Sequence, residues 1–387
     1  MAMRIAIIGG GPGGLTLARI LHQHGIRASV FEREPDPLFR PQGGTLDLHE
    51  DSGLLALRAA GLSEAFRKIA RAEDQGSRLY DKAGTLLYDD GHLAQDRPEV
   101  DRTALRAMLL DALPAGTVIW NHGLDDLQQD ADGSWRLRCG DKRAGPFDLV
   151  VGADGTWSRV RPWLSPYAPQ YSGVCFLEFG IDDADRLHPE LARLVGRGKC
   201  GVEADGKAII VQRNGNGHFR GYAIFRVPVA WMTRKFDLAR PDQVRAALAA
   251  EFAGFAEIFL ALFRASNDNF ALRPIHALPV GHCWQPRRGL TLIGDAAHVM
   301  SPFGGDGVNN AMLDAAELGA ALAAHRDSPH AALTAVNAFE QAMFVRTVPS
   351  ATGAADAIAT LLSHDGQALT LEMYRSHHAG TAELTVS

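Results

Sequence analysis

The sequence predicts a doubly wound α/β domain that is interrupted by a second, β-rich domain. Three observations support this fold class. A strand, a glycine-rich turn and a helix open the chain, short apolar runs bounded by glycine recur far downstream, and a β-rich stretch lies between them. With 387 residues, of which 46% are hydrophobic, the chain is large enough for two domains.

The first 31 residues alternate quickly between strand and helix. The mostly apolar residues 4–8 predict a strand, a helix follows from Gly13 to the stop at Gly25, and a second strand covers residues 28–31. Apolar runs at residues 147–152 and 289–294 have the pattern of parallel strands that are buried on both faces. We therefore expect one parallel sheet that is assembled from three separate parts of the chain.

The pattern changes to alternating strands with polar turns between residues 173 and 228, and an alanine-rich helical stretch follows. We expect a discontinuous nucleotide-binding α/β domain over residues 1–75, 100–172 and 285–345. The substrate-binding domain, with a mixed β-sheet, is expected over residues 76–99 and 173–284. Residues 346–387 are expected to form a C-terminal bracing helix and a tail.

Composition and charge exclude several classes of function. A net charge of −6 argues against nucleic-acid binding, and no apolar run reaches the roughly 18 residues of a membrane helix, so we expect neither a membrane span nor a signal peptide. The cysteines lack zinc-site spacing, so we expect no metal and a reducing compartment. Packing roles are predicted for Cys139, Cys175, Cys200 and Cys283, and for Phe252, Phe255, Phe259 and Phe263, which recur at helical spacing.

The glycine-rich turn has the GxGxxG spacing of a dinucleotide site. Gly9, Gly11 and Gly14 follow a strand and open a helix, whose free N–H groups and positive dipole end favour a pyrophosphate. Glu32 closes the second strand, where an acid accepts hydrogen bonds from an adenosine ribose. Such an acid disfavours a 2′-phosphate, so we expect FAD or NAD as the tightly held nucleotide. The alternative is a glycine-rich turn with a surface glutamate.

Two further motifs follow predicted buried strands. Asp154 and Gly155 come after the strand at residues 147–152, and Asp295, after the strand at residues 289–294, can accept a hydrogen bond from a ribityl hydroxyl. A helix that begins near Gly307 directs its positive end at an anion. For His298, within this motif, we expect a structural role or a place beside the flavin rather than metal ligation.

These three motifs, with Arg33 and Pro302, resemble the class A, single-component FAD-dependent monooxygenases. Within this class the sequence is most similar to the tetracycline-inactivating flavin monooxygenases, and the similarity extends from about Arg4 to Phe344. The segments that carry it are residues 43–49, 102–106, 117–120 and 301–309. The resemblance implies a Rossmann-like FAD-binding domain with an inserted mixed β-sheet substrate domain.

The resemblance also implies FAD and NADPH as cofactors and residues for each part of FAD. Glu32 and Arg33 would hold the adenosine, Arg102 would lie near the phosphates and the ribityl chain, and Asp154 is associated in the family with both FAD and NADPH. The full set of expected cofactor-binding residues is Gly9, Gly11, Pro12, Gly14, Glu32, Arg33, Asp47, Leu48, Arg102, Asp154, Gly294, Asp295, Pro302, Gly305, Gly307, Val308 and Asn309.

The sequence departs from the family where the tetracycline pocket is expected. Glu178 stands at the position of a Gln, Gln212 at that of an Asn, and Arg220 and Tyr222 at those of a His and a Gly. The charged residues Glu178 and Arg220 would change the hydrogen bonding in this pocket, and the bulky ring of Tyr222 would change the space that is left for a substrate. The expected substrate-binding residues are Glu178, Gln212, Arg220, Tyr222, Pro302, Phe303 and Gly304.

The activity that the resemblance implies is the NADPH-dependent transfer of one oxygen atom of dioxygen, through a flavin C4a-hydroperoxide, to an electron-rich phenolic or enolic polycyclic compound such as a tetracycline. No catalytic side chain is assigned, because the flavin carries the chemistry. The alternatives are an aromatic hydroxylase with another substrate, a related flavin dehydrogenase or halogenase, and a non-catalytic flavin-binding protein. We expect a cytoplasmic monomer whose partners are dioxygen and a small aromatic or polycyclic substrate.

Overall fold

The computed structural model of the protein describes residues 3–39, 43–90, 97–363 and 365–384. The chain divides into two compact units, each built from three segments. The first unit combines Met1–Ala70, Arg102–Gln170 and His276–Ala355, and the second combines Arg71–Asp101, Tyr171–Ile275 and Asp356–Ser387.

A five-stranded parallel sheet forms the centre of the first unit, in the order β17, β11, β1, β2, β7. The register pairs Ile5 with Leu149 on one side and with Ala28 on the other, so three distant parts of the chain meet as the sequence predicts. Strands β1 and β11 are buried at every position, which explains their continuous apolar sequences. The strands are β1 (Ile5–Ile8), β2 (Ala28–Phe31), β7 (Val118–Ile119), β11 (Leu149–Gly152) and β17 (Leu290–Leu292).

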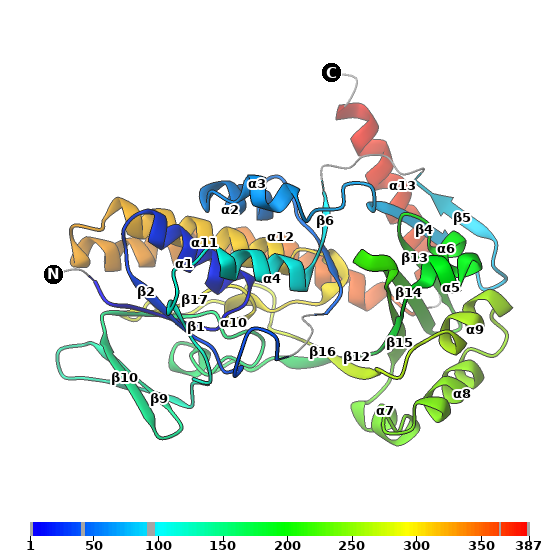
Figure 1. Cartoon of the computed structure of the whole chain (residues 1–387), viewed down its shortest axis with the longest axis horizontal. Helices are drawn as coiled ribbons and strands as arrows, with labels where there is room; N and C mark the ends of the chain where they lie inside the picture. Colours follow the sequence, from blue (N-terminus) through cyan, green and yellow to red (C-terminus); the bar gives the residue numbers. More distant parts are fainter. Residues whose placement is uncertain (1–2, 40–42, 91–96, 364, 385–387) are drawn as a thin grey trace. The chain divides into compact units, whose positions relative to one another are not determined.

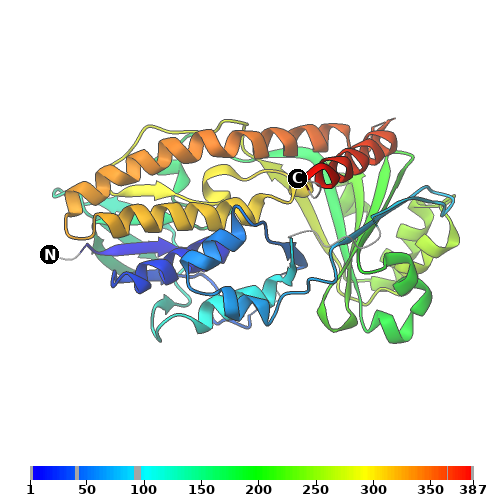
Figure 2. The ribbon, with the colours of Figure 1, turned by 90° about the horizontal axis from the view of Figure 1, so that it is seen from above.

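Helices α1 (Pro12–Gln23) and α11 (Gly307–Ala324) pack against one another on one side of this sheet (Figure 1). Gly319 allows their close approach, because a Cβ there would lie 2.7 Å from Cγ2 of Ile20. Helix α12 (Pro329–Thr360) runs beside α11 (Figure 2). The other helices of this unit are α2 (Gly53–Ala59), α3 (Ser63–Arg67), α4 (Arg102–Asp111) and α10 (Asp295–His298).

The first unit also has a three-stranded antiparallel sheet, in the order β10, β9, β8, at the opposite side from α1 and α11 (Figure 1). Trp135 and Leu137 of β9 belong to the same hydrophobic core as β1 and β11. The strands are β8 (Asp126–Gln129), β9 (Trp135–Cys139) and β10 (Lys142–Phe147), and the short strand β3 (Thr45–Asp47) also lies in this unit.

The second unit is built on a seven-stranded sheet, in the order β16, β12, β15, β14, β13, β4, β5. One face packs against helices, and the core between them contains Phe252, Phe255, Phe259 and Phe263, which confirms their predicted packing role. The strands are β4 (Gly76–Tyr80), β5 (Leu86–Asp89), β12 (Gln170–Ile181), β13 (Gly198–Ala204), β14 (Lys207–Arg213), β15 (Phe219–Arg226) and β16 (Ala271–Ala277), with β6 (Glu99–Asp101) apart from the sheet. The helices are α5 (Ala184–Leu187), α6 (Pro189–Val195), α7 (Val229–Lys235), α8 (Pro241–Glu251), α9 (Glu257–Arg264) and α13 (Gly366–Leu384).

Residues 276–284 lie in the first unit, not in the substrate domain where the sequence placed them. Hydrogen bonds give the physical reason. His282 Nδ1 lies 2.6 Å from the carbonyl oxygen of Ala297 and Nε2 lies 2.8 Å from Oγ of Ser165, while Trp284 Nε1 donates to Glu340. These long-range partners are invisible to a reading of local pattern.

The C-terminal residues also divide differently from the expected separate helix and tail. Residues 346–355 group with the first unit, and residues 356–387 group with the second. Glu203 of β13 accepts hydrogen bonds from the Leu362 N–H at 2.6 Å and from Thr370 Oγ1 at 3.4 Å, and Arg226 of β15 donates to the Leu361 carbonyl at 2.8 Å. These contacts tie the end of the chain to the seven-stranded sheet.

One of the four cysteines departs from its predicted packing role. Cys139, Cys175 and Cys200 are buried, but Cys283 is exposed, because the segment around it lies at the surface of the first unit. In the part of the chain that the structure describes, no helix combines the length and the apolar composition needed to cross a membrane.

Candidate active site

The glycine-rich turn joins β1 to α1 and has no room for side chains at two of its glycines. A Cβ on Gly14 would lie 2.2 Å from the carbonyl oxygen of Gly9, and a Cβ on Gly9 would lie 2.3 Å from that of Ala153. Over Gly11 the space is open, since a Cβ there would meet no atom of the described residues within 4 Å. Gly11 caps α1 without a side-chain hydrogen bond and Pro12 is its first residue, so the first N–H groups of the helix remain for a ligand.

Glu32 lies at the end of β2 and is 8% exposed. Its Oε2 accepts a hydrogen bond from the Gly10 N–H at 2.6 Å, and its Oε1 accepts one from the Glu34 N–H at 2.9 Å. Each carboxylate oxygen keeps a second lone pair that a ribose hydroxyl can use. Glu32 thereby both shapes the turn and offers acceptors beside it, while Arg33 is exposed next to it.

Arg106 is a site residue to which the sequence assigned no role. Its buried guanidinium forms an ion pair with Glu34 at 2.8 Å and donates to the carbonyl of Gly10 at 3.2 Å. Arg106 therefore connects Glu34 to the glycine-rich turn and stabilises the turn. One feature of the sequence could have revealed this role. Arg106 lies with Leu105 and Leu109 on the buried side of α4, and a charged residue at a buried position needs a partner.

These elements line an open cavity of about 770 Å³ in the first unit. Its wall includes the glycine-rich turn, the carboxylate of Glu32, Arg106 and residues 153–159. Asp154 lines it, and burial raises the pKa of this carboxyl group. Asp154 Oδ2 accepts the Arg159 N–H at 2.7 Å, but Oδ1 has no hydrogen-bond partner among the described residues. A buried acceptor is therefore left for a ligand.

The loops after β11 and β17 are held together by Arg161, which is 3% exposed. Its Nη2 donates to the carbonyl of Thr156 at 2.7 Å and its Nη1 donates to that of Ala296 at 3.0 Å. The hydroxyl of Thr156 lies 3.3 Å from Oδ2 of Asp295. The structure thus brings the motifs at Asp154 and Asp295 side by side, and Arg161, which also lines the cavity, is a second site residue to which the sequence assigned no role.

A third group of predicted residues meets at the start of α11. Asn309 Oδ1 accepts N–H groups of His49 at 2.9 Å and Gly53 at 3.2 Å, and its Nδ2 donates to the carbonyl of Asp47 at 3.0 Å. His49 Nε2 lies 3.1 Å from Oδ2 of Asp47 and Nδ1 lies 3.7 Å from Oδ1 of Asp306. Helix α11 begins without a side-chain cap, so its first N–H groups face this cluster unpaired by side chains.

The remaining predicted residues of the first unit lie around these loops. Leu48 is fully buried under α2, whereas Arg102 is exposed at the start of α4, where a Cβ on Gly43 would contact its Cδ at 3.5 Å. Pro302–Gly304 forms a short 3₁₀ turn, and a Cβ on Gly305 would lie 3.6 Å from Oδ1 of Asp47. Gly307 and Val308 open α11 and are half-buried.

The other expected substrate residues lie on one sheet of the second unit. Glu178 of β12 stands opposite Tyr222 of β15, and Arg220 stands opposite Gln212 of β14. Arg220 Nη1 donates to Glu178 Oε1 at 2.5 Å. Arg273 of β16 binds the same carboxylate, and sequence reasoning missed it because the pairing of β16 with β12 is not visible in local pattern.

The geometry of the first unit fits FAD. The open helix end at Gly11 supplies N–H donors for a pyrophosphate, and Glu32 supplies acceptors for a ribose. Asp154 and Asp295 add acceptors for hydroxyl groups, and the cavity is large enough for a nucleotide. The glycines at positions 9 and 14 are required by contacts within the protein, and the space over Gly11 is left to the ligand.

Comparison with known proteins agrees with this geometry. A family model described as an FAD binding domain matches residues 2–183 and 284–334. The monooxygenase penA of Penicillium thymicola is 33% identical over 363 residues, which cover 81% of this chain and 83% of that protein. The 3-amino-4-hydroxybenzoate 2-monooxygenase PtnB3 of Streptomyces platensis is 30% identical over 352 residues, which cover 85% of this chain and 82% of that protein.

Two solved structures show the same fold. HpxO of Klebsiella pneumoniae, complexed with FAD and uric acid, has a TM-score of 0.79 at 24% identity and covers 97% of this chain and 93% of that one. The tetracycline destructase Tet(51) has a TM-score of 0.73 at 21% identity, and the match covers 100% of this chain and 98% of that one. Because the family model spans more than half of the sequence, the chain belongs to the FAD-binding-domain family, and it is a class A FAD-dependent monooxygenase.

Proposed function

We propose that this protein consumes a reduced nicotinamide dinucleotide, NADPH or NADH, and hydroxylates an electron-rich phenolic or enolic ring. The observation that carries the proposal is the uncapped start of α11 beside Asp47, His49 and Asn309, in the same unit as the nucleotide cavity. When bound, FAD supplies the redox chemistry and the activation of dioxygen. The N–H groups of residues 307 and 308 stabilise negative charge that develops next to the helix end.

The surrounding side chains of the first unit hold loops and cofactor groups in place and take no part in the reaction themselves. Asn309 fixes the segment from Asp47 to Gly53 against the helix start through three hydrogen bonds. Asp295 and Asp154 orient hydroxyl groups of the cofactor, and Arg161 keeps their two loops in register. We assign no side chain as a general base, since FAD, when bound, would supply the redox chemistry.

The relatives support a ring-hydroxylating activity. PtnB3 is named for a hydroxylated aminobenzoate, and the HpxO structure contains uric acid, so both act on or bind small electron-rich rings. A tetracycline also carries phenolic and enolic groups and remains a candidate substrate, supported by the resemblance to tetracycline-inactivating enzymes. The Glu178 and Arg220 pair favours a different polar pattern from the uncharged residues of that pocket, so we propose an aromatic hydroxylase first.

The proposal is tested on purified, FAD-loaded protein. Oxidation of NADPH and of NADH in air is followed with uric acid, 3-amino-4-hydroxybenzoate and tetracycline, together with product mass under isotopically labelled dioxygen and with released hydrogen peroxide. We expect at least one compound to stimulate oxidation and to gain one labelled oxygen atom. Stimulated oxidation without oxygen insertion would indicate a dehydrogenase instead, and failure of every phenol and enol in a wider panel would overturn the proposal.

A further inference from the structure

The wall of the first unit's cavity includes the loop that follows β7. His122, Gly123 and Leu124 of this loop line the cavity together with Glu32. The His122 N–H donates to the carbonyl oxygen of Glu32 at 2.8 Å, which fixes the loop against the end of β2. The residue that offers acceptors for a ribose and the imidazole of His122 are therefore neighbours on the cavity wall.

The hydrogen bonds of His122 determine which ring nitrogen carries a proton. Nδ1 lies 2.7 Å from the carbonyl oxygen of Trp120, and a carbonyl oxygen can only accept, so Nδ1 donates. In the neutral imidazole Nε2 is then an acceptor, and it has no hydrogen-bond partner among the described residues. The ring also packs against Phe31, with the two ring centroids 6.0 Å apart. His122 thus presents an acceptor whose orientation the protein fixes.

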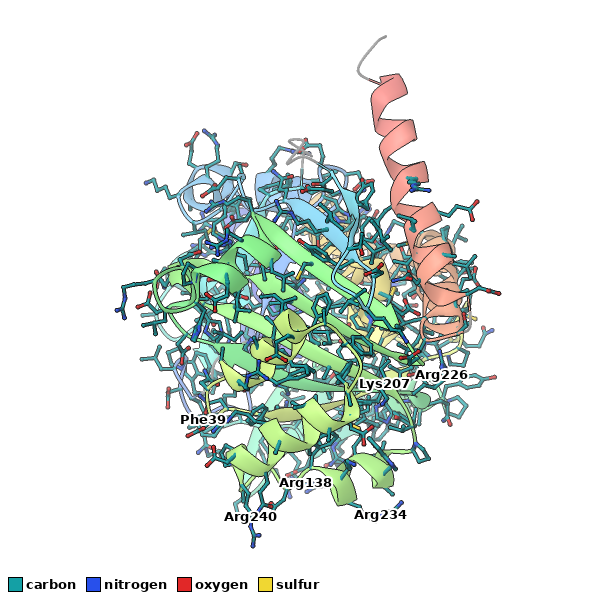
Figure 3. The ribbon with its side chains drawn as sticks, turned by 90° about the vertical axis from the view of Figure 1, so that its right-hand side faces the viewer. Phe39, Arg138, Lys207, Arg226, Arg234 and Arg240 are labelled. Carbon is teal, nitrogen blue, oxygen red and sulfur yellow. The ribbon has the colours of Figure 1, made fainter. Side chains whose placement is uncertain are left out.

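The other polar groups of this loop are N–H donors and an acid that is already bound. The N–H groups of residues 123–124 have no hydrogen-bond acceptor in the part of the chain that the structure describes. Oδ2 of Asp125 accepts the Gly140 N–H at 2.6 Å and lies 3.6 Å from Nη1 of Arg138, which is labelled in Figure 3. Asp125 is therefore stabilised by protein donors, whereas Nε2 of His122 is left for a ligand.

An acceptor beside N–H donors is complementary to one edge of adenine. The base of a nucleotide is attached to the ribose carbon next to the one that bears the 2′-hydroxyl, so a ribose at Glu32 brings its base to the adjoining wall. Adenine carries an amino donor at position 6 beside the acceptor N1. A base with a carbonyl at position 6, such as guanine or hypoxanthine, presents an acceptor there instead. Such a base would place its carbonyl oxygen against a nitrogen that cannot donate.

We propose that His122 selects the base of the flavin dinucleotide. Its Nε2 accepts a hydrogen bond from the amino group of adenine, which favours FAD over flavin dinucleotides that carry a carbonyl in place of the amino group. Trp120 orients the imidazole through its carbonyl oxygen, and Cζ of Arg106 lies 5.4 Å from the centroid of the Trp120 ring. Because Arg106 also binds the carbonyl of Gly10, the base position and the glycine-rich turn share one support. The inference goes beyond the proposed function, since it holds for any ring that the protein hydroxylates.

Calorimetric titration of the FAD-free, full-length protein tests this selection. FAD is compared with flavin hypoxanthine dinucleotide, which differs only in the base, and ADP is compared with IDP, which both lack the flavin. We expect FAD and ADP to bind at least about threefold more tightly than their hypoxanthine counterparts, the contribution of one neutral hydrogen bond. His122→Phe keeps a flat ring without the acceptor, so the two members of each pair should then bind within about twofold of one another.

Two control variants remove a histidine elsewhere and another polar group of the same cavity. His330→Phe, at an exposed position of α12, and Asp125→Asn should both keep the full preference for adenine. Thermal unfolding of each variant checks that the fold is intact. If His122→Phe is unstable, His122→Gln takes its place. Its amide offers an oxygen and N–H groups alike, so it should also reduce the preference to within about twofold.

Three results would overturn the inference. Equal affinity of the unmodified protein for both bases would mean that Nε2 does not select the amino group and that the ring at most stacks on the base. A preference that survives in the His122 variants, or one that is lost in Asp125→Asn, would assign the selection to another group. These titrations involve no oxygen insertion, so their failure leaves the proposed function untouched, and a protein that hydroxylates no ring could still select adenine.

Discussion

Nε2 of His298 lies 2.7 Å from Oδ2 of Asp314, a carboxylate that is inaccessible to solvent. The same oxygen accepts the Gly294 N–H at 2.8 Å, and Oδ1 accepts from Nη2 of Arg346 at 2.6 Å. Burial opposes the charged carboxylate, but His298, Arg346 and the Gly294 N–H outweigh it and keep the pKa of Asp314 below its usual value. Because Gly294 directly precedes Asp295, Asp314 fixes the turn that presents Asp295 to the cofactor.

Asp314→Asn should lower the free energy of unfolding by about 1–3 kcal/mol, because it removes the charged acceptor shared by His298 and Arg346 and leaves the partly buried Arg346 with Glu317 as its anionic partner. The lowered pKa means that the stabilisation is present above the unfolded-state pKa of about 4 and is lost as the pH falls through the lower folded-state value. Urea unfolding at neutral pH and at pH values below 4 measures both effects. Asp327→Asn, whose side chain is 97% exposed, is the control and should change stability by less than about 0.5 kcal/mol. A loss below about 1 kcal/mol for Asp314→Asn would contradict this role.

Two alanine substitutions in the glycine-rich turn should separate folding from cofactor binding. Gly14→Ala places a Cβ 2.2 Å from the Gly9 carbonyl oxygen and should destabilise the protein by several kcal/mol, on the order of a strained core substitution. Gly11→Ala meets no atom of the described residues within 4 Å, so the FAD-free protein should keep its stability within about 1 kcal/mol. Gly11→Ala should nevertheless weaken the binding of FAD at least about tenfold, which is measured by flavin fluorescence when FAD is titrated into the FAD-free protein. Unchanged FAD affinity would show that the pyrophosphate does not approach Gly11.

Asp295→Ala should reduce the FAD content of the purified protein, because the half-buried carboxylate is the acceptor that the loop after β17 offers to a ribityl hydroxyl. Asp295→Asn should retain more FAD than Asp295→Ala, since its amide oxygen still accepts a hydrogen bond. The measurement is the ratio of flavin to protein absorbance. Asp111→Ala, at an exposed position at the end of α4, controls for the loss of a carboxylate. Full occupancy in Asp295→Ala would count against the ribityl contact.

Sequence alone predicts the parts of the site that lie within one local motif. The turn from Gly9 to Gly14 and the acid at Glu32 belong to one continuous unit of β1, turn, α1 and β2, so their spacing in the sequence predicts their relative positions. The apolar runs at residues 147–152 and 289–294 likewise predict β11 and β17, because strands that are buried on both faces are predominantly apolar. Local sequence patterns are therefore sufficient to predict these three strands and the glycine-rich turn of the first unit.

The supporting residues escape such reasoning because their partners are distant in sequence. Asp314 and Arg161 are charged, and a charged residue without a visible partner is interpreted as exposed. Arg161 is buried only because the loops after β11 and β17 converge on it, and Arg273 is placed by the pairing of β16 with β12. The unit boundaries near residues 276 and 356 were missed for the same reason, since long-range hydrogen bonds decide them.

Glu340 of α12 shows what an unmatched buried acid should do to stability. It is inaccessible to solvent, Oε1 accepts from Trp284 Nε1 at 2.9 Å, and Oε2 has no hydrogen-bond partner among the described residues. Burial raises the pKa of Glu340 to about 7, and the side chains of Trp284 and Thr291, which favour the charged form, offset only part of this effect. The folded protein therefore favours the neutral acid.

Because the folded-state pKa of Glu340 exceeds the ordinary value of 4.5, its contribution to stability is fully present below pH 4.5 and is lost as the pH rises through about 7. Glu340→Gln, which mimics the neutral acid, should remove this decline and gain about 3 kcal/mol over the unmodified protein at pH 8. Urea unfolding between pH 5 and pH 8 measures the two slopes. Glu64→Gln, whose side chain is 77% exposed, should leave the slope of the unmodified protein unchanged. Equal slopes for Glu340→Gln and the unmodified protein would mean that Glu340 is solvated in solution, and the packing of α12 against Trp284 would then have to be looser than the 2.9 Å hydrogen bond implies.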